Sequence, residues 1–306
     1  MGAEPTMSLA GELRALDTRI NELLPPQYQH SYASVSPESM GSAGLKYDAD
    51  GRVAWGDVWT SFCELALAGG PPHRGSLLEP VARDDAMADP ARTAEVGAEI
   101  ARAIGLTTGL PVAADPTPGW VGVACATEAQ AAWLQFAVTA ENVSARRIGS
   151  TLKLPAGPAF RLEKEIKNVV VSLSKSHHYW DSHLTDTQKT LADVTIVEPA
   201  TPDDVSASPA DARAAATEVE RRIHAAGRPT MPRRYAGWVG IQCGSVDECV
   251  WMHRAILADR VLARREGVVL FLPVGTSPDP DHADRVGDAF QQARRLWEAS
   301  ATTGQR

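Results

Sequence analysis

The chain has 306 residues, 44% of them hydrophobic, which is enough for about two domains with ordinary cores. Its 38 acidic and 30 basic residues give a net charge of −8, which argues against nucleic acid as a partner. The four cysteines form no CxxC pair, so neither a disulfide framework nor a thiolate zinc site is indicated. A membrane partner is not expected either, since about 18 consecutive apolar residues occur nowhere and the start lacks a signal-peptide pattern. We therefore expect a cytoplasmic protein.

An N-terminal region, residues 1–75, is expected to precede the main fold. An amphipathic helix ending at Pro25-Pro26 is predicted by apolar residues at helical spacing, namely Leu9, Leu13, Leu16, Ile20 and Leu23. Residues 27–44 are rich in Ser, Tyr and Gly without a period, which is typical of either a lid over a site or a disordered segment. A hairpin over 45–55 and a helix over 57–68 are predicted to follow.

The chain contains an internal repeat. Residues 119–157 align with residues 237–275 without a gap, and 17 of the 39 positions are identical. Matches farther upstream, with a one-residue shift, extend the two units to 76–157 and 194–275. Similarity at this level predicts an internal duplication.

Both units contain the same predicted elements. A short apolar run before a Glu-Pro pair predicts a strand, and an Asp-Pro or Ser-Pro pair begins a helix that we expect to end near Gly105 or Gly227. The GWVG strand, a second capped helix and a hairpin follow. The order β-α-β-α-β-β predicts an α+β fold in which each unit is a two-layer α/β sandwich. The sequence leaves open whether each unit has one extra strand before GWVG.

Each predicted sheet presents a Trp and an Arg on the face that its helices do not cover. Alternation along the strands puts Trp120 beside Arg146 in the first unit and Trp238 beside Arg264 in the second. Such faces either pack against each other or line a ligand cleft between the units. All four residues are therefore candidates for substrate binding.

The loop GGPPHRG, residues 69–75, comes directly before the first unit. His73 is a group that can transfer a proton near neutral pH, and Arg74 can hold a carboxylate or phosphate with two hydrogen bonds. The alternative is that the loop is only a tight helix-to-strand turn, which needs no function. The glycine spacing does not match a nucleotide-binding loop.

A connecting segment, residues 158–193, separates the units, and its pattern predicts a long helix over 160–183. His177 lies on the apolar stripe and comes near Asp181 by helical spacing, which makes these two a candidate acid–base pair. Lys175 and His178 are expected on the polar side of the helix, as candidates for substrate binding. His183 is expected to point elsewhere.

We expect a composite site if the loop and the connecting helix meet near the pseudo-twofold axis. His73, Arg74, Lys175, His177 and His178 would then form one cationic pocket for a small anionic molecule. The leading hypothesis is an enzyme or ligand-binding protein for such a metabolite.

Two other functions are left open by the sequence. One is a non-catalytic interaction or assembly protein that uses the repeat faces, with self-association as an option. The other is a metal-dependent enzyme at the histidine cluster, although no zinc-binding spacing is present. No cofactor is indicated. A C-terminal helix and tail, residues 276–306, are expected to act as a cap.

Overall fold

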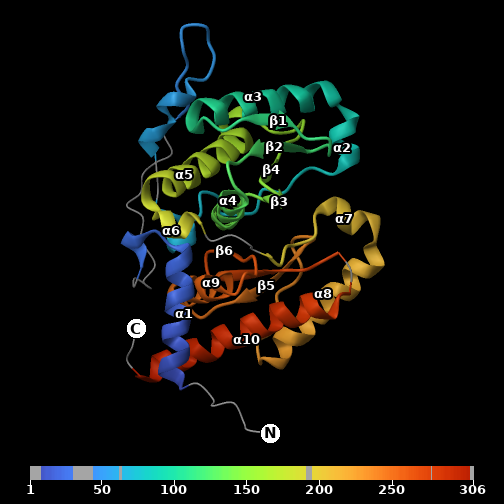
Figure 1. Ribbon diagram of the computed structural model, residues 1–306. Helices are drawn as coiled ribbons and strands as arrows, with labels where there is room; N and C mark the ends of the chain where they lie inside the picture. Colours follow the sequence, from blue (N-terminus) through green and yellow to red (C-terminus); the bar gives the residue numbers. More distant parts are fainter. Residues whose placement is uncertain (1–7, 30–43, 62–63, 191–194, 277, 304–306) are drawn as a thin grey trace.

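The computed structural model describes residues 8–29, 44–61, 64–190, 195–276 and 278–303. Within these residues the chain forms two small antiparallel sheets, each covered by helices, so the predicted α+β class is confirmed. One sheet and its helices form a first half, and the second sheet and its helices form a second half stacked against it (Figure 1). Among the described residues, no helix combines the length and the apolar character that crossing a bilayer requires.

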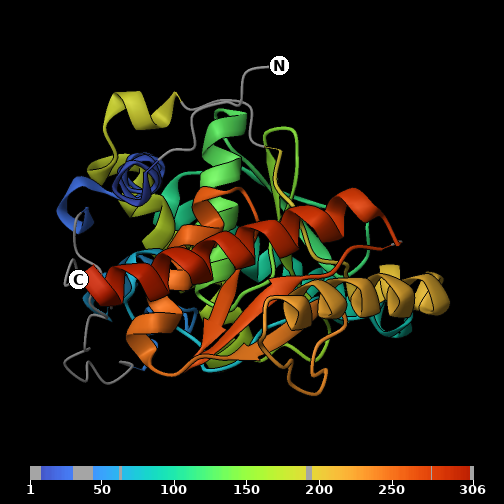
Figure 2. The ribbon, with the colours of Figure 1, turned by 90° about the horizontal axis from the view of Figure 1, so that it is seen from below.

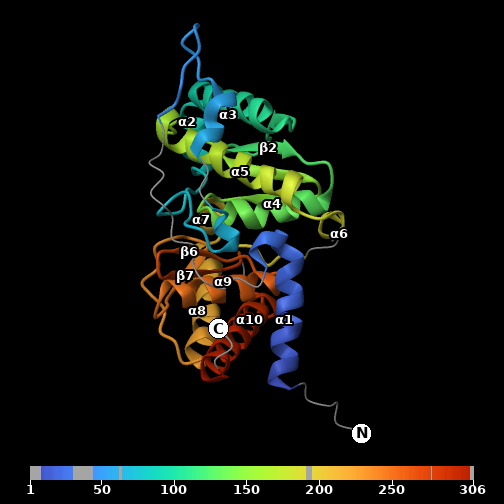
Figure 3. The same cartoon turned by 90° about the vertical axis from the view of Figure 1, so that its left-hand side faces the viewer.

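The N-terminal region contains one long helix and several short turns. Helix α1 (Leu9–Leu23) is the predicted amphipathic helix, capped by Ser8, and it packs along α9 and α10 of the second half (Figure 3). The predicted helix over 57–68 is wrong, because 3₁₀ turns occur at Trp55–Ser61 and Ala66–Ala68 instead. The N–H of Ala66 donates to the Glu141 carboxylate and is not used in an α-helical hydrogen bond. The lid or disorder prediction for 27–44 falls mostly outside the described residues.

The first half surrounds a four-stranded sheet in the order β1-β2-β4-β3. Its elements are α2 (Arg83–Ala88), α3 (Pro90–Thr108), β1 (Val112–Ala114), β2 (Trp120–Ala124), α4 (Glu128–Ala140), β3 (Arg146–Ile148), β4 (Thr151–Pro155), a π-helical turn (Leu162–Ile166), α5 (Lys167–His183) and α6 (Asp186–Lys189). Strand β1 is the extra strand that the sequence left open. Helix α3 runs through Gly105 and ends at Gly109, whose positive φ of 73° closes it, so the predicted end is corrected.

The second half surrounds a three-stranded sheet in the order β5-β7-β6. Its elements are α7 (Pro202–Ala207), α8 (Pro209–Ala225), β5 (Trp238–Gln242), α9 (Val246–Ala258), β6 (Arg264–Glu266), β7 (Val269–Pro273) and α10 (Pro280–Thr303). The central strand pairs have corresponding registers, since Trp238 faces Pro273 as Trp120 faces Pro155. The counterpart of β1 is reduced to one bridge, between Thr230 and Ile241.

The first predicted strand of each unit is also reduced to a single parallel bridge. Leu78 pairs with Val143 in the first half, and Val197 pairs with Val261 in the second. The proline two residues later in each segment has no N–H to donate, so a longer ladder does not form. The sandwiches are therefore smaller than the sequence predicted.

A third helix completes each half and was not part of the predicted unit. Helix α5 packs on α3 and α4, and α10 packs on α8 and α9 in the same manner. Figure 2 shows α10 crossing the second half beside α8. The predicted connecting helix thus belongs to the packing of the first half, and the predicted C-terminal cap is its counterpart in the second.

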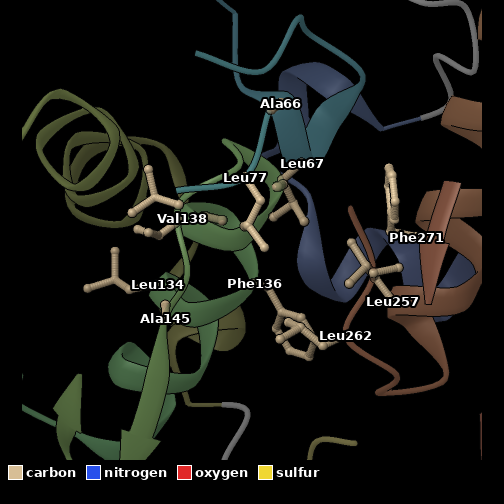
Figure 4. Packing of buried hydrophobic residues seen from close by; sticks show 14 of the residues in the cluster. Ala66, Leu67, Leu77, Leu134, Phe136, Val138, Ala145, Leu257, Leu262 and Phe271 are labelled. Atoms are coloured by element: carbon tan, nitrogen blue, oxygen red, sulfur yellow. The ribbon is translucent and has the colours of Figure 1, made fainter. Parts of the chain in front are cut away.

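A single hydrophobic core extends through both halves (Figure 4). Helix α4 is buried from Ala129 to Ala140 and contributes Leu134, Phe136 and Val138, while Leu257 and Leu262 come from the second half. Burial on this scale supplies the main driving force for holding the halves together. Any site between them must therefore fit into a well-packed interface.

Candidate functional site

The predicted histidine cluster lies at the C-terminal end of α5. His177 is half-buried, while His178 and Asp181 are exposed. Burial lowers the pKa of His177, and the charge of Asp181 only partly opposes this. No group of three histidine, cysteine or carboxylate side chains within the described ranges is arranged to hold a metal ion. The catalytic roles of His177 and Asp181 stay predictions.

His183 does not point away from this cluster, and that expectation is wrong. Its Nε2 lies 3.3 Å from Nε2 of His178, and its Nδ1 lies 3.1 Å from the amide nitrogen of Gln27. The N–H of Leu184 donates to the carbonyl of Tyr179, five residues earlier, at the end of α5. This wider last turn brings His183 over His178, which ideal helical spacing would not do.

Lys175 is buried, not on a polar face as predicted. Its side chain is only 1% exposed, on a helix that packs against both α3 and α4. The ammonium lies 2.8 Å from Oε1 of Glu141 and donates to the carbonyl of Glu64 at 3.3 Å. A buried ammonium with these partners is neutralised and is not offered to an anion.

Glu141 is the residue that the sequence analysis missed. It follows the end of α4 and is fully buried. Its carboxylate also accepts the backbone N–H of Ala66 at 3.0 Å and of His73 at 2.8 Å. The loop and α5 therefore do meet, but at a carboxylate, and the predicted cationic pocket is occupied by this carboxylate.

The loop residues themselves serve the packing between the halves. Burial lowers the pKa of His73 to about 4, so the imidazole is neutral near pH 7. The side chain of Arg74 donates to the carbonyl of Ser76 at 3.1 Å. Arg265 from the second half donates to the carbonyls of Gly69 and Gly70 at 3.3 and 2.6 Å. The roles predicted for His73 and Arg74 in catalysis and anion binding stay predictions.

The Trp and Arg side chains lie between the halves. Trp120 and Trp238 are 7% and 3% exposed, and both border a cavity of about 20 Å³, room for roughly one water molecule. Arg264 is fully buried, with its guanidinium 4.9 Å from the Trp238 ring centre and 2.7 Å from Glu266. Arg146 borders the same cavity and pairs with Asp204 at 3.1 Å. Both cations already have carboxylate partners.

A larger cavity lies within the first half, between α3 and the segment that leads from β1 into β2. Its volume is about 420 Å³, within the range of small-molecule sites. Its lining is formed by Ala86, Met87, Pro90, Thr93, Ala94, Gly97, Ala98, Ala101, Ala114, Asp115, Pro116, Thr117, Pro118, Gly119, Trp120, Val121 and Ala156. Small and apolar residues dominate it, and Met87 is 54% exposed.

Asp115 is the ionisable residue in this lining. Its carboxylate accepts Nζ of Lys153 at 2.9 Å and the backbone N–H of Thr117 at 2.8 Å. Burial alone would raise the pKa of Asp115, but the hydrogen bonds from Lys153 and Thr117 outweigh it and lower the pKa. The cavity therefore has a charged carboxylate in its wall, compensated from behind by a cation that does not line the cavity.

The repeat provides an internal comparison for this cavity. The helices align from Pro90 with Pro209, and the loops align from Gly119 with Gly237. Thirteen of the seventeen lining positions then differ between the halves, and three of them bear on the space itself: Ala98, Ala101 and Asp115 are matched by Thr217, Glu220 and Arg233. Each counterpart has a larger or differently charged side chain.

Arg233 occupies the corresponding place in the second half. Its guanidinium donates to both carboxylate oxygens of Glu220, at 2.8 and 3.0 Å, and reaches the hydroxyl of Thr217 at 3.5 Å. These contacts tie the loop before β5 to α8. In the first half Asp115 pairs with Lys153 at 2.9 Å, and the alanines of α3 leave the space open.

Comparison with known proteins adds no relative to this description. No family model, no curated protein and no solved structure matches the chain. A proposal for the function therefore rests on the cavity, on its Asp115 and on the contrast with the second half.

Proposed function

We propose that this protein binds a small molecule in the cavity of the first half, between α3 and residues 114–121. The observation that carries the proposal is the difference between the halves: the same framework is open at Ala98 and Ala101 but bridged at Thr217 and Glu220 by Arg233. A cavity of about 420 Å³ at a place where the other half is bridged by an ion pair is best explained by an occupant.

The proposal includes the origin of the two halves in one duplicated unit. It is supported by the 17 identities in 39 aligned positions and by the corresponding strand registers. One copy would then have retained or acquired the binding cavity, while the other became a closed structural support. Divergence of this kind after duplication relieves one copy of the constraint to bind.

Binding is favoured over catalysis by the chemistry of the lining. Thr93 donates to the carbonyls of Ala86 and Asp89, and Asp115 is held ionised by its hydrogen bonds. A carboxyl group with a lowered pKa is a poor proton donor at neutral pH. The predicted enzyme with histidine acid–base groups has no such group in this lining.

The test uses an uncharged fluorescent ligand, N-phenyl-1-naphthylamine, whose emission rises in apolar surroundings. We expect saturable binding to one site on the wild-type protein. Ala98→Trp should fill the cavity and weaken binding by at least about tenfold, with the melting temperature retained. Ala91→Trp, on an exposed position of α3 outside the lining, is the matched control and should bind as the wild type does. Equal binding by Ala98→Trp would overturn the proposal.

A further inference from the structure

We infer that Asp115 is a specificity-determining residue that restricts the cavity of the first half to uncharged, largely apolar molecules. This inference rests on the proposed function, since it names the class of ligand that the same cavity accepts. It also departs from the anionic metabolite that the sequence indicated.

The charge balance of the cavity wall disfavours an anionic ligand. Within the described lining, Asp115 is the ionisable side chain, and the other side chains with a polar atom are Thr93, Thr117 and Trp120. Lys153 compensates Asp115 but is only 12% exposed and does not border the cavity. An incoming anion would therefore meet a carboxylate before it meets any cation. Burying an unpaired charge there costs free energy that the ligand cannot recover.

The cavity wall does not favour a cationic ligand either. The carboxylate of Asp115 already accepts from Lys153 and from the N–H of Thr117, and its side chain is only 5% exposed. A second cation would have to approach within a few ångströms of the Lys153 ammonium. Repulsion between the two cations offsets the attraction to the single carboxylate. The wall thus favours neither sign of charge in a ligand.

The shape of the cavity walls favours a compact apolar ligand. One wall is the small-residue face of α3, including Ala94, Gly97 and Ala98, and the other contains Pro116 and Pro118. Prolines hold their backbone rigidly, and alanines and glycine add no flexible side chain to the opposite wall. Two rigid walls of small residues suit a compact apolar body such as an aromatic ring system.

A matched pair of dyes tests this inference. N-phenyl-1-naphthylamine and 1-anilinonaphthalene-8-sulfonate share their ring system and differ by one sulfonate. Only binding that Ala98→Trp removes is attributed to the cavity. We expect the wild type to bind the uncharged dye at least about tenfold more tightly than the sulfonate. Asp115→Asn, which leaves Lys153 without its carboxylate, should lower that ratio by about tenfold.

A reciprocal variant keeps the test decisive if Asp115→Asn does not fold. Lys153→Gln leaves Asp115 uncompensated and should raise the preference for the uncharged dye. An unchanged ratio in the variant that folds, or equal affinity of the wild type for both dyes, would overturn the inference while the proposed function stands. Absence of any binding that depends on Ala98 would instead contradict the proposed function, and the inference with it.

Discussion

The guanidinium of Arg233 lies 2.8 Å from Oε1 of Glu220, and this ion pair closes in the second half the space that is open in the first. The counterpart of Arg233 is Asp115, which pairs with Lys153. The two halves thus carry opposite charges at one loop position, and the facing helix carries alanine in the first half and glutamate in the second.

The first prediction transfers this closure to the first half. A variant with Ala98→Thr, Ala101→Glu and Asp115→Arg carries the three side chains of the second half. We expect the new Arg and Glu to pair across the cavity and to weaken binding of N-phenyl-1-naphthylamine by at least about tenfold. Circular dichroism and the melting temperature check that the fold is kept. A correctly folded variant that binds the dye as the wild type does would show that the cavity is not the site.

The second prediction concerns the buried pair of Glu141 and Lys175. Both side chains are at most 1% exposed, so removing one partner leaves an unpaired buried charge. Lys175→Met should lower the free energy of unfolding by about 3–5 kcal/mol, measured by urea denaturation. Lys189→Met, which removes an exposed hydrogen bond to the carbonyl of Asp181, is the control and should cost less than about 1 kcal/mol. A small loss for Lys175→Met would mean that the pair contributes little to the stability of the first half.

The third prediction is a pH dependence of stability caused by His253. Its side chain is buried, and its Nε2 donates a hydrogen bond to the carbonyl of Ala263. Burial lowers the pKa of His253 to about 3 from the ordinary 6.5. The folded-state pKa is depressed, so the unfolded chain binds a proton first as the pH falls below 6.5. Stability is therefore full above pH 6.5 and is lost on acidification, at about 1.4 kcal/mol per pH unit until the folded-state pKa is reached.

The repeat supplies the matched variant for this test. Gln135 occupies the equivalent position in the first half, where its Nε2 donates to the carbonyl of Ala145 at 3.3 Å. His253→Gln should keep the corresponding hydrogen bond and fold stably at pH 7. Urea denaturation between pH 7 and pH 5 should show a shallower loss of stability for the variant than for the wild type. Identical slopes would mean that His253 is protonated equally in both states.

The fourth prediction distinguishes two glycines of α3. Gly105 lies inside the helix with open space at its Cβ position, whereas Gly109 ends the helix with a φ of 73°. Gly105→Ala should stabilise the protein by about 0.5–1 kcal/mol, since alanine favours helix. Gly109→Ala should destabilise it by about 1–2 kcal/mol, because a Cβ is strained in the left-handed conformation. Thermal unfolding of both variants checks the opposite signs.

Much of the fold follows from local patterns in the sequence. Strand β2 and its counterpart β5 were placed by alternation, and α4 and α9 by their capping side chains, Thr127 and Ser245, which accept hydrogen bonds as predicted. Errors arose where tertiary contacts replace local ones. The segment around Ala66 is the clearest case, since its N–H is satisfied by the distant Glu141.

The site was less predictable because it consists of small residues. The alanines at 94, 98 and 101 have no functional group that could indicate a site. Histidines and lysines do have such groups and were therefore chosen as candidates, although one of them, Lys175, is fully buried. The sequence does indicate the site when the two repeats are compared at positions of the helix and the loop that face each other. Ala101 and Asp115 align with Glu220 and Arg233, a pair of opposite charges that indicates a contact in the second half. The role of Glu141, at the end of α4, could likewise not be predicted, because its partner is revealed only by the structure.

The most direct test of the central claim is a crystal structure of the protein soaked with 1-bromonaphthalene, with the bromine located by its anomalous scattering. We predict a bromine peak between α3 and residues 115–119, and none between α8 and residues 233–237. A peak confined to the interface between the halves, or present equally at both helices, would contradict the account.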